Sequence, residues 1–180
     1  MVKKSSVKIP LKWKSNCGTY TVNITSDCLI KIINIAKSAH PKEIGSSLIG
    51  YYSKDGFDAY ITNIVEISND SKGTNNRFIR GTKGLKKFFS QLKSTQNQHY
   101  IGEWHSHPDY YSIPSNIDDN SQFDISNNEK VNCPECLLLI IGGDFFKEPS
   151  LGIFVYSKVK GRINLNPDTE GSFFKYNTKI

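Results

Sequence analysis

The apolar residues of this chain are spread over many short runs, and the longest of these is Leu137–Ile141. A helix that crosses a bilayer needs about 20 consecutive apolar residues, so the sequence predicts no membrane span. Short apolar runs bounded by turn residues are instead typical of buried strands. The chain has 180 residues, which is the length of one ordinary domain. We therefore expect a single domain over residues 1–180.

Strand-like and helix-like patterns mix along the chain without strict alternation, which predicts an α/β fold. Ser26 and Asp27 are typical N-cap residues for the first helix. The polar segment Ser68–Asn76 is expected to be a loop, and Lys54–Gly56 a turn between two strands. The expected helices are Asp27–Ala39, about Thr82–Ser94, and one that starts at Ser115. The expected strands are Gly18–Ile24, Glu43–Tyr52, Ala59–Ile67, Tyr100–His107, Leu137–Gly142 and Leu151–Tyr156.

The chain is basic, with a net charge of +6 and a pI near 9.0. The excess lies in Met1–Lys14 and Lys72–Lys93 rather than in one stripe, which favours a solvated surface. A basic chain could also bind nucleic acid, but the sequence contains no recognition motif for it. No nucleic-acid partner is therefore expected. Met1–Lys14 contains neither an uninterrupted apolar segment nor a cleavage site typical of export signals. We therefore expect a cytoplasmic protein with reduced cysteines.

Cys133 and Cys136 have the CxxC spacing that structural zinc sites use in two copies. The other cysteines, Cys17 and Cys28, are eleven residues apart, so they do not supply the second pair. A zinc deaminase would need a histidine followed by glutamate at the second position, and no histidine here has one. The role of the Cys133–Cys136 pair stays open.

Two histidines, His105 and His107, stand at the end of an expected strand. Because side chains alternate between the faces of a strand, both histidines project from the same face, where two imidazoles can share one metal ion. Glu103 is expected on that face as an acceptor for a histidine N–H, and Trp104 on the other, in the core.

Ser115 and Asp118 have the spacing of a helix capping box. A helix that starts just after the histidine strand could direct Asp118 back to the two histidines. Three protein ligands would leave a fourth position for water, as in a catalytic zinc site. Such water needs a base, and Glu43, which precedes the small residues Gly45–Ser47, is the candidate.

This combination of residues resembles the JAMM (MPN-plus) metalloprotease family. The family pattern is a distant glutamate, then H-x-H-P, then S-x-x-D, and every polar position is filled here by Glu43, by His105–Pro108, and by Ser115 and Asp118. The resemblance covers about residues 27–157. Ile101–Pro108 is especially similar to the compact bacterial members, which are encoded with ubiquitin-transfer-like enzymes in anti-phage operons, including CBASS systems.

The resemblance implies a mixed, curved β-sheet flanked by helices. It also implies that His105, His107 and Asp118 hold one Zn²⁺ per chain, that Glu43 accepts a proton from the attacking water, and that Ser115 donates a hydrogen bond to the oxyanion. The implied substrate is a conjugated protein or a ubiquitin-like protein with a flexible C-terminal tail. The tail is expected to run near Gly45–Ser47 and Asp109–Ile113, and the enzyme to release it from lysine or from another protein.

Two alternatives remain. Some relatives of this fold lack the metal site and act as scaffolds in protein complexes, although here all ligand positions are filled. Two histidines and one carboxylate could also bind Fe(II), but Fe(II) gives no role to Glu43 or Ser115 and ranks below zinc.

Overall fold

The computed structural model of the chain describes residues 4–75 and 77–179. Within them the helices are α1 (Ser26–Ala39), α2 (Leu85–Gln96) and α3 (Asn116–Asn127). The strands are β1 (Lys4–Pro10), β2 (Lys12–Ser15), β3 (Thr21–Ile24), β4 (Gly45–Tyr52), β5 (Asp58–Ile64), β6 (Lys72–Thr74), β7 (Arg77–Ile79), β8 (His99–Pro108), β9 (Glu135–Asp144), β10 (Glu148–Ser157), β11 (Gly161–Pro167) and β12 (Phe173–Lys179).

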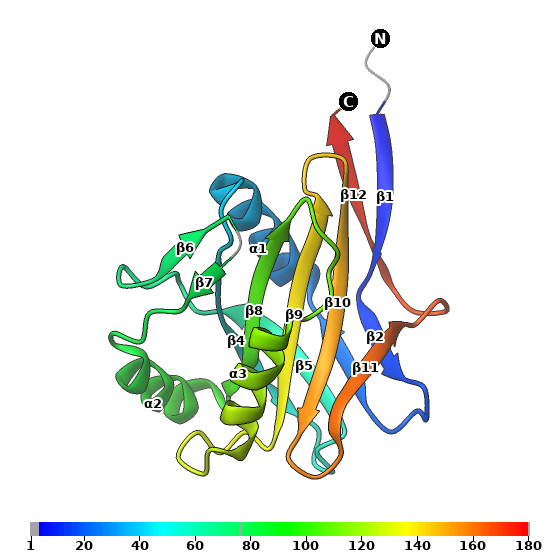
Figure 1. Ribbon diagram of the computed structural model, residues 1–180. Helices are drawn as coiled ribbons and strands as arrows, with labels where there is room; N and C mark the ends of the chain where they lie inside the picture. The colour runs from blue at the N-terminus through cyan, green and yellow to red at the C-terminus, as the bar shows by residue number, and fades with distance from the viewer. Residues whose placement is uncertain (1–3, 76, 180) are drawn as a thin grey trace.

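Eight of these strands form a closed barrel, with the order β10-β11-β2-β3-β5-β4-β8-β9 (Figure 1). The pairs β3–β5 and β8–β9 are parallel, and every other pair in the barrel is antiparallel. Parallel neighbours need a crossover connection. Helix α3 provides it between β8 and β9, and α1 lies in the connection between β3 and β5. The expected mixed, curved sheet flanked by helices is therefore confirmed, and its curvature is large enough to close a barrel.

Helix α1 is amphipathic, as its apolar spacing predicts. Leu29, Ile32, Ile33 and Ala36 are all at most 1% exposed and belong to the main core. The N-cap is Thr25, whose side chain accepts a hydrogen bond from the Cys28 backbone N–H. The expected caps, Ser26 and Asp27, lie instead in the first turn, where the carboxylate of Asp27 faces the positive end of the helix dipole.

The main core fills the barrel and the space under α1. Trp104 on β8 is 1% exposed within it, which confirms its expected place in the core. A second, smaller core cluster lies on β9 and β10 and is covered by Phe123 of α3. The barrel wall next to α3 is therefore apolar, and Phe123 packs the helix against it.

Several elements differ from the sequence-based expectations. The expected loop Ser68–Asn76 contains β6, which pairs with β7 in a short hairpin. The expected strand Gly18–Ile24 begins only at Thr21, because Gly18 has a φ of +71° in the turn after β2. β1, β2, β11 and β12 were not predicted. None of the described helices is long and apolar enough to cross a membrane.

Candidate active site

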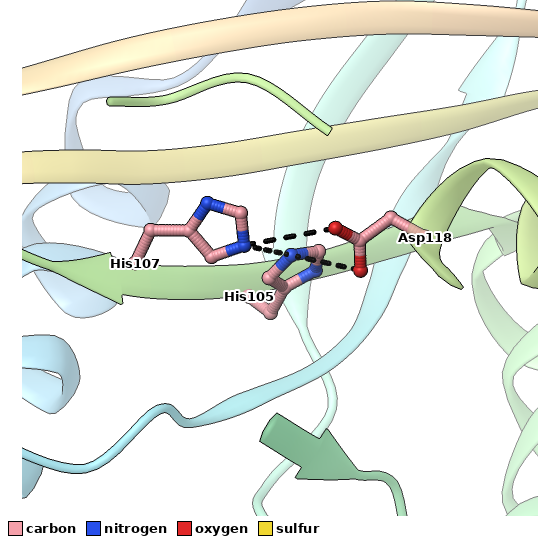
Figure 2. Close-up of side chains that lie close together, drawn as sticks. All are labelled: His105, His107 and Asp118. Atoms are coloured by element: carbon pink, nitrogen blue, oxygen red, sulfur yellow. Dashed lines mark hydrogen bonds and ion pairs between the residues drawn. The ribbon is translucent and has the colours of Figure 1, made fainter. Parts of the chain in front are cut away.

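The two histidines of β8 lie side by side, as the strand alternation predicts. Their Nε2 atoms are 3.0 Å apart, and their ring centroids are 4.8 Å apart (Figure 2). Gly45 makes this placement possible, because a Cβ there would lie 2.2 Å from the Trp104 carbonyl oxygen and 2.8 Å from the His105 Cβ. The small residue of β4 thus lets the two strands approach closely where the histidines project.

Helix α3 brings the third side chain to the histidines. Ser115 is its N-cap, and Ser115 and Asp118 form the expected capping box. In addition, the Ser115 hydroxyl donates to Asp118 Oδ2 at 2.7 Å. Asp118 Oδ1 is 3.3 Å from His105 Nε2, and Asp118 Oδ2 is 3.7 Å from His107 Nε2. The cap therefore holds the Asp118 carboxylate toward both imidazoles (Figure 2).

This donor set fits a tetrahedral zinc ion. Zinc binds histidine nitrogen and carboxylate oxygen at about 2.0–2.2 Å, which puts two ligand atoms about 3.3 Å apart at tetrahedral angles. The separations of 3.0, 3.3 and 3.7 Å lie around that value. Among the described residues, one set of potential metal ligands has donor atoms that all lie within 4.8 Å of one another. It consists of His105, His107 and Asp118.

The protonation of these groups suits a cation. Burial lowers the pKa of His107, and the neighbouring His105 lowers it further, which favours a neutral ring with a free lone pair. For Asp118, burial acts to raise the pKa, but the hydrogen bond and charge of His105 and the hydrogen bonds from Ser115 hold it well below its usual range. A neutral imidazole and an ionised carboxylate are the forms that bind metal.

A backbone carbonyl orients His107. Its Nδ1 is 3.2 Å from the Tyr111 carbonyl oxygen, so a proton on Nδ1 leaves Nε2 free to act as a ligand. The loop that carries Tyr111 lies directly on the glycines of β9 and β10. A Cβ at Gly142 would lie 2.5 Å from the Tyr110 carbonyl oxygen, and a Cβ at Gly152 would lie 2.0 Å from the Ser112 carbonyl oxygen. Only glycine, which has no Cβ, lets the loop lie this close to β9 and β10.

Glu43 lies between α1 and β4 and lines the same cleft as His107, Ser115 and Asp118. The β6–β7 hairpin holds its backbone: Glu43 N–H donates to the Thr74 carbonyl oxygen at 2.7 Å, and a Cβ on Gly73 would lie 2.1 Å from the Glu43 carbonyl oxygen. Burial raises the pKa of Glu43; the charge of His105 opposes this, and Asp118 adds to it. A raised pKa makes the carboxylate a better proton acceptor.

The cleft beside these residues has a volume of about 390 Å³. One wall comes from the β6–β7 hairpin, with Asn75, Arg77 and Phe78. Another wall comes from the loop after β8 and the start of α3. Its apolar side chains are open to solvent: Tyr110 is 71% exposed, Tyr111 82%, Ile113 61% and Ile117 65%.

Two expectations about neighbouring residues are wrong. Gly45–Ser47 does not border the cleft, because this part of β4 is buried and paired with β8. Glu103 does not accept from a histidine. Its carboxylate instead forms an ion pair with Arg80 Nε at 3.0 Å and accepts hydrogen bonds from Tyr100 and Ser47.

The hairpin wall was missed from the sequence, because β6 and β7 are three residues each and have no clear strand pattern. Cys133 and Cys136 lie away from the cleft. Both are buried and free, and the Cys136 thiol donates to Gln122 of α3.

Comparison with known proteins gives a consistent result. Residues 25–154 match the family model of the prokaryotic homologs of the JAB domain. A protein of Enterobacter hormaechei subsp. hoffmannii named CD-NTase/cGAS isopeptidase is 32% identical over 143 residues, which is 79% of each chain. A solution structure from Desulfitobacterium hafniense has a TM-score of 0.56 at 20% identity and covers 79% of this chain and 88% of its own. Another, from Salinibacter ruber, has a TM-score of 0.51 at 20% identity and covers 83% and 94%.

Proposed function

Because the chain belongs to the family of prokaryotic homologs of the JAB domain, we propose that it is a zinc-dependent isopeptidase. The observation that carries this proposal is the convergence of His105, His107 and Asp118 beside a cleft that Glu43 lines together with His107 and Asp118. Two imidazole nitrogens and one carboxylate leave a coordination position open, which is typical of catalytic rather than structural zinc.

In this proposal His105, His107 and Asp118 hold one Zn²⁺ ion per chain. When bound, the ion supplies Lewis-acid chemistry: it polarises the scissile carbonyl and lowers the pKa of water. Glu43 accepts the proton of the attacking water and later passes it to the leaving amine. The raised pKa of Glu43 suits both steps, the acceptance of the proton from water and its release to the amine.

Ser115 stabilises the oxyanion of the tetrahedral intermediate. Its hydroxyl donates to Asp118 Oδ2 here. Rotation about the Cβ–Oγ bond can direct the same proton to the carbonyl oxygen while Oγ still accepts from the Asp118 backbone N–H. A hydrogen bond of this kind contributes about 3–4 kcal/mol to the transition state. The capping box fixes the Ser115 backbone, so the donor is positioned before substrate arrives.

The substrate we propose is a protein joined through its flexible C-terminal tail to a lysine or to another protein. The relative from Enterobacter hormaechei is named for its action on CD-NTase/cGAS, and we infer that a CD-NTase-like protein is the conjugated partner here too. The setting is anti-phage defence, with ubiquitin-transfer-like enzymes encoded nearby. The apolar wall of the cleft suits an extended tail with small or apolar side chains near the scissile bond.

The test uses a conjugate made by the transfer enzymes of the same operon. The purified protein is analysed for metal and then incubated with the conjugate, with and without a chelator. We expect about one zinc per chain, cleavage that stops on chelation, and recovery on adding Zn²⁺. A scaffold would bind the conjugate without cleaving it, and this outcome with zinc-loaded protein would overturn the proposal.

A further inference from the structure

Two parts of the chain carry its excess positive charge: residues 1–26, with five lysines and no acidic residue, and a longer segment that borders the cleft. The longer segment, residues 71–102, also contains no Asp or Glu. The basic residues of this segment are Lys72, Arg77, Arg80, Lys83, Lys86, Lys87 and Lys93. The segment comprises the hairpin β6–β7, helix α2 and the first part of β8.

The hairpin and α2 lie outside the barrel, on the same side of it (Figure 1). The hairpin also forms one wall of the active-site cleft, through Asn75, Arg77 and Phe78. Helix α2 is fixed to β8 by Phe89, whose ring packs edge-on against Tyr100 with the centroids 5.6 Å apart. A protein whose tail enters the cleft would therefore meet the hairpin and α2 with its folded part.

Most of these charges are free. Arg80 is neutralised by Glu103, at 3.0 Å. In contrast, five exposed cations make no ion pair within 4.0 Å among the residues that the structure describes. These are Lys72, Arg77, Lys83, Lys86 and Lys87. A surface that gathers like charges without compensation is destabilising by itself and is typical of a binding face.

Two apolar side chains are exposed among these cations. Ile79 of the hairpin is 49% exposed, and Phe88 of α2 is 38% exposed. Apolar contacts surrounded by charges are typical of the interface between two proteins. A duplex is bound mainly through its phosphates and needs no exposed apolar contacts, and the aliphatic Ile79 offers no ring on which a single-stranded base could stack. The pair therefore favours a protein partner over a nucleic acid.

We propose that β6–β7 and α2 form a docking surface for an acidic face of the conjugated protein. The same protein places its C-terminal tail in the cleft, so the inference rests on the proposed function. Charges at the rim of an interface mainly raise the association rate, by about 10–10³-fold, and their effect falls steeply with salt. The surface would select the conjugate before the cleft binds its tail.

The test compares two substrates with the same tail. One is a fluorogenic peptide with the C-terminal residues of the CD-NTase-like protein from the same operon, and the other is that intact protein joined by its C-terminus to a fluorescent protein. The variant K83E/K86E/K87E reverses three charges outside the cleft. Its matched control, K54E/K158E/K175E, reverses three exposed lysines that lie outside residues 71–102 and changes the net charge equally.

We expect K83E/K86E/K87E to lower kcat/KM for the intact protein about 10–100-fold at low salt, through KM rather than kcat. The difference should shrink as the salt concentration rises. The control variant should match wild type on both substrates. Equal kcat/KM of the two variants on the intact protein would overturn the docking surface while leaving the isopeptidase in place. If wild-type protein with zinc cleaves neither substrate, the proposed function itself fails.

Nucleic acid is the other partner that a basic surface could fit. Binding of a 30-base-pair DNA duplex and of a single-stranded RNA is therefore measured at physiological salt for wild type and for both variants. The proposal expects no binding that distinguishes the two variants. Binding that is lost only in K83E/K86E/K87E, with unchanged kcat/KM on the intact protein, would assign the surface to nucleic acid and overturn the proposal.

Discussion

Glu43 is the residue whose proposed role is easiest to separate from metal binding, because it lines the cleft without belonging to the ligand cluster. Glu43→Gln keeps the size and the backbone hydrogen bond to Thr74 but removes the basic oxygen. We expect the variant to fold and to bind zinc, with hydrolysis reduced about 10²–10⁴-fold. Turnover and metal content are measured on the same sample. Near-wild-type turnover would remove Glu43 from the mechanism.

His107→Ala is the matched comparison for that variant. It removes a ligand rather than a base, so zinc content and turnover should fall together. The base is identified if Glu43→Gln loses activity but keeps its full zinc content. The ligand is identified if His107→Ala loses both activity and zinc. Equal loss of zinc in the two variants would contradict the separate roles.

The four cysteines differ in the exposure of their thiols. Cys17 is exposed, and hydrogen bonds with Ser15 and Thr19 lower the pKa of its thiol to about 7. Burial raises the pKa of Cys28 to about 12 and that of Cys136 well above its usual range. Because the thiolate is the nucleophile, we expect iodoacetamide to label Cys17 alone in the native protein, at a rate that rises with pH and is half-maximal near pH 7. Peptide mass mapping at several pH values checks this.

Fast labelling of Cys133 or Cys136 in the native state would contradict their burial. It would also reopen the question of a reactive CxxC pair. Labelling of all four thiols after denaturation serves as the control.

Helix α3 is the element whose position decides the geometry of the site, because it carries both Ser115 and Asp118. It has few apolar contacts: Phe123 packs against Tyr156, and the buried α3 side chains among the described residues are Gln122 and Ser126. A polar anchor holds its first turn. Arg162 Nη1 donates to both carboxylate oxygens of Asp119, at 2.8 and 2.9 Å, and the Tyr156 hydroxyl donates to Asp119 as well.

Arg162→Met tests this anchor. Removing a partly exposed ion pair should cost about 1 kcal/mol or less in unfolding free energy. The larger effect is expected on the site: because Asp118 follows the helix, zinc affinity should fall about tenfold, the lower end of what loss of a supporting contact does. Denaturation and zinc titration measure the two effects. Lys158→Met, in the turn that precedes the strand of Arg162, is the control, and an equal affinity in both variants would contradict the anchor.

At the scale of the whole molecule, the sequence predicts the parts whose pattern is local. The apolar spacing of α1, the strand alternation around His105 and His107, and the capping box of Ser115 and Asp118 all lie within a few residues of chain, and the structure has each of them. A four-part motif then links the distant pieces, so the sequence alone predicts that the three candidate ligands and Glu43 lie together.

What escaped prediction depends on contacts between distant residues. The barrel closes through pairs such as Leu165 with Ser15, and β2 and β11 are too short or too polar to show a strand pattern. The hairpin wall of the cleft depends on the bond from Glu43 N–H to Thr74, which no local spacing encodes. The prediction that a bound tail runs near Gly45–Ser47 is wrong for a related reason. This segment pairs with β8, a contact between distant parts of the chain.

In the proposed site, zinc would join His105 and His107 at the end of β8 to Asp118 at the start of α3, so its binding should stabilise the whole chain. A ligand that binds only the folded state at about 100 times its Kd adds about 2.7 kcal/mol. For a chain of this size, that corresponds to a rise in Tm of roughly 5–10 °C. Thermal unfolding of metal-free protein with and without Zn²⁺ measures the shift. Mg²⁺, which prefers oxygen ligands, and the His107→Ala variant should give no rise. A rise of equal size in that variant would place the ion elsewhere.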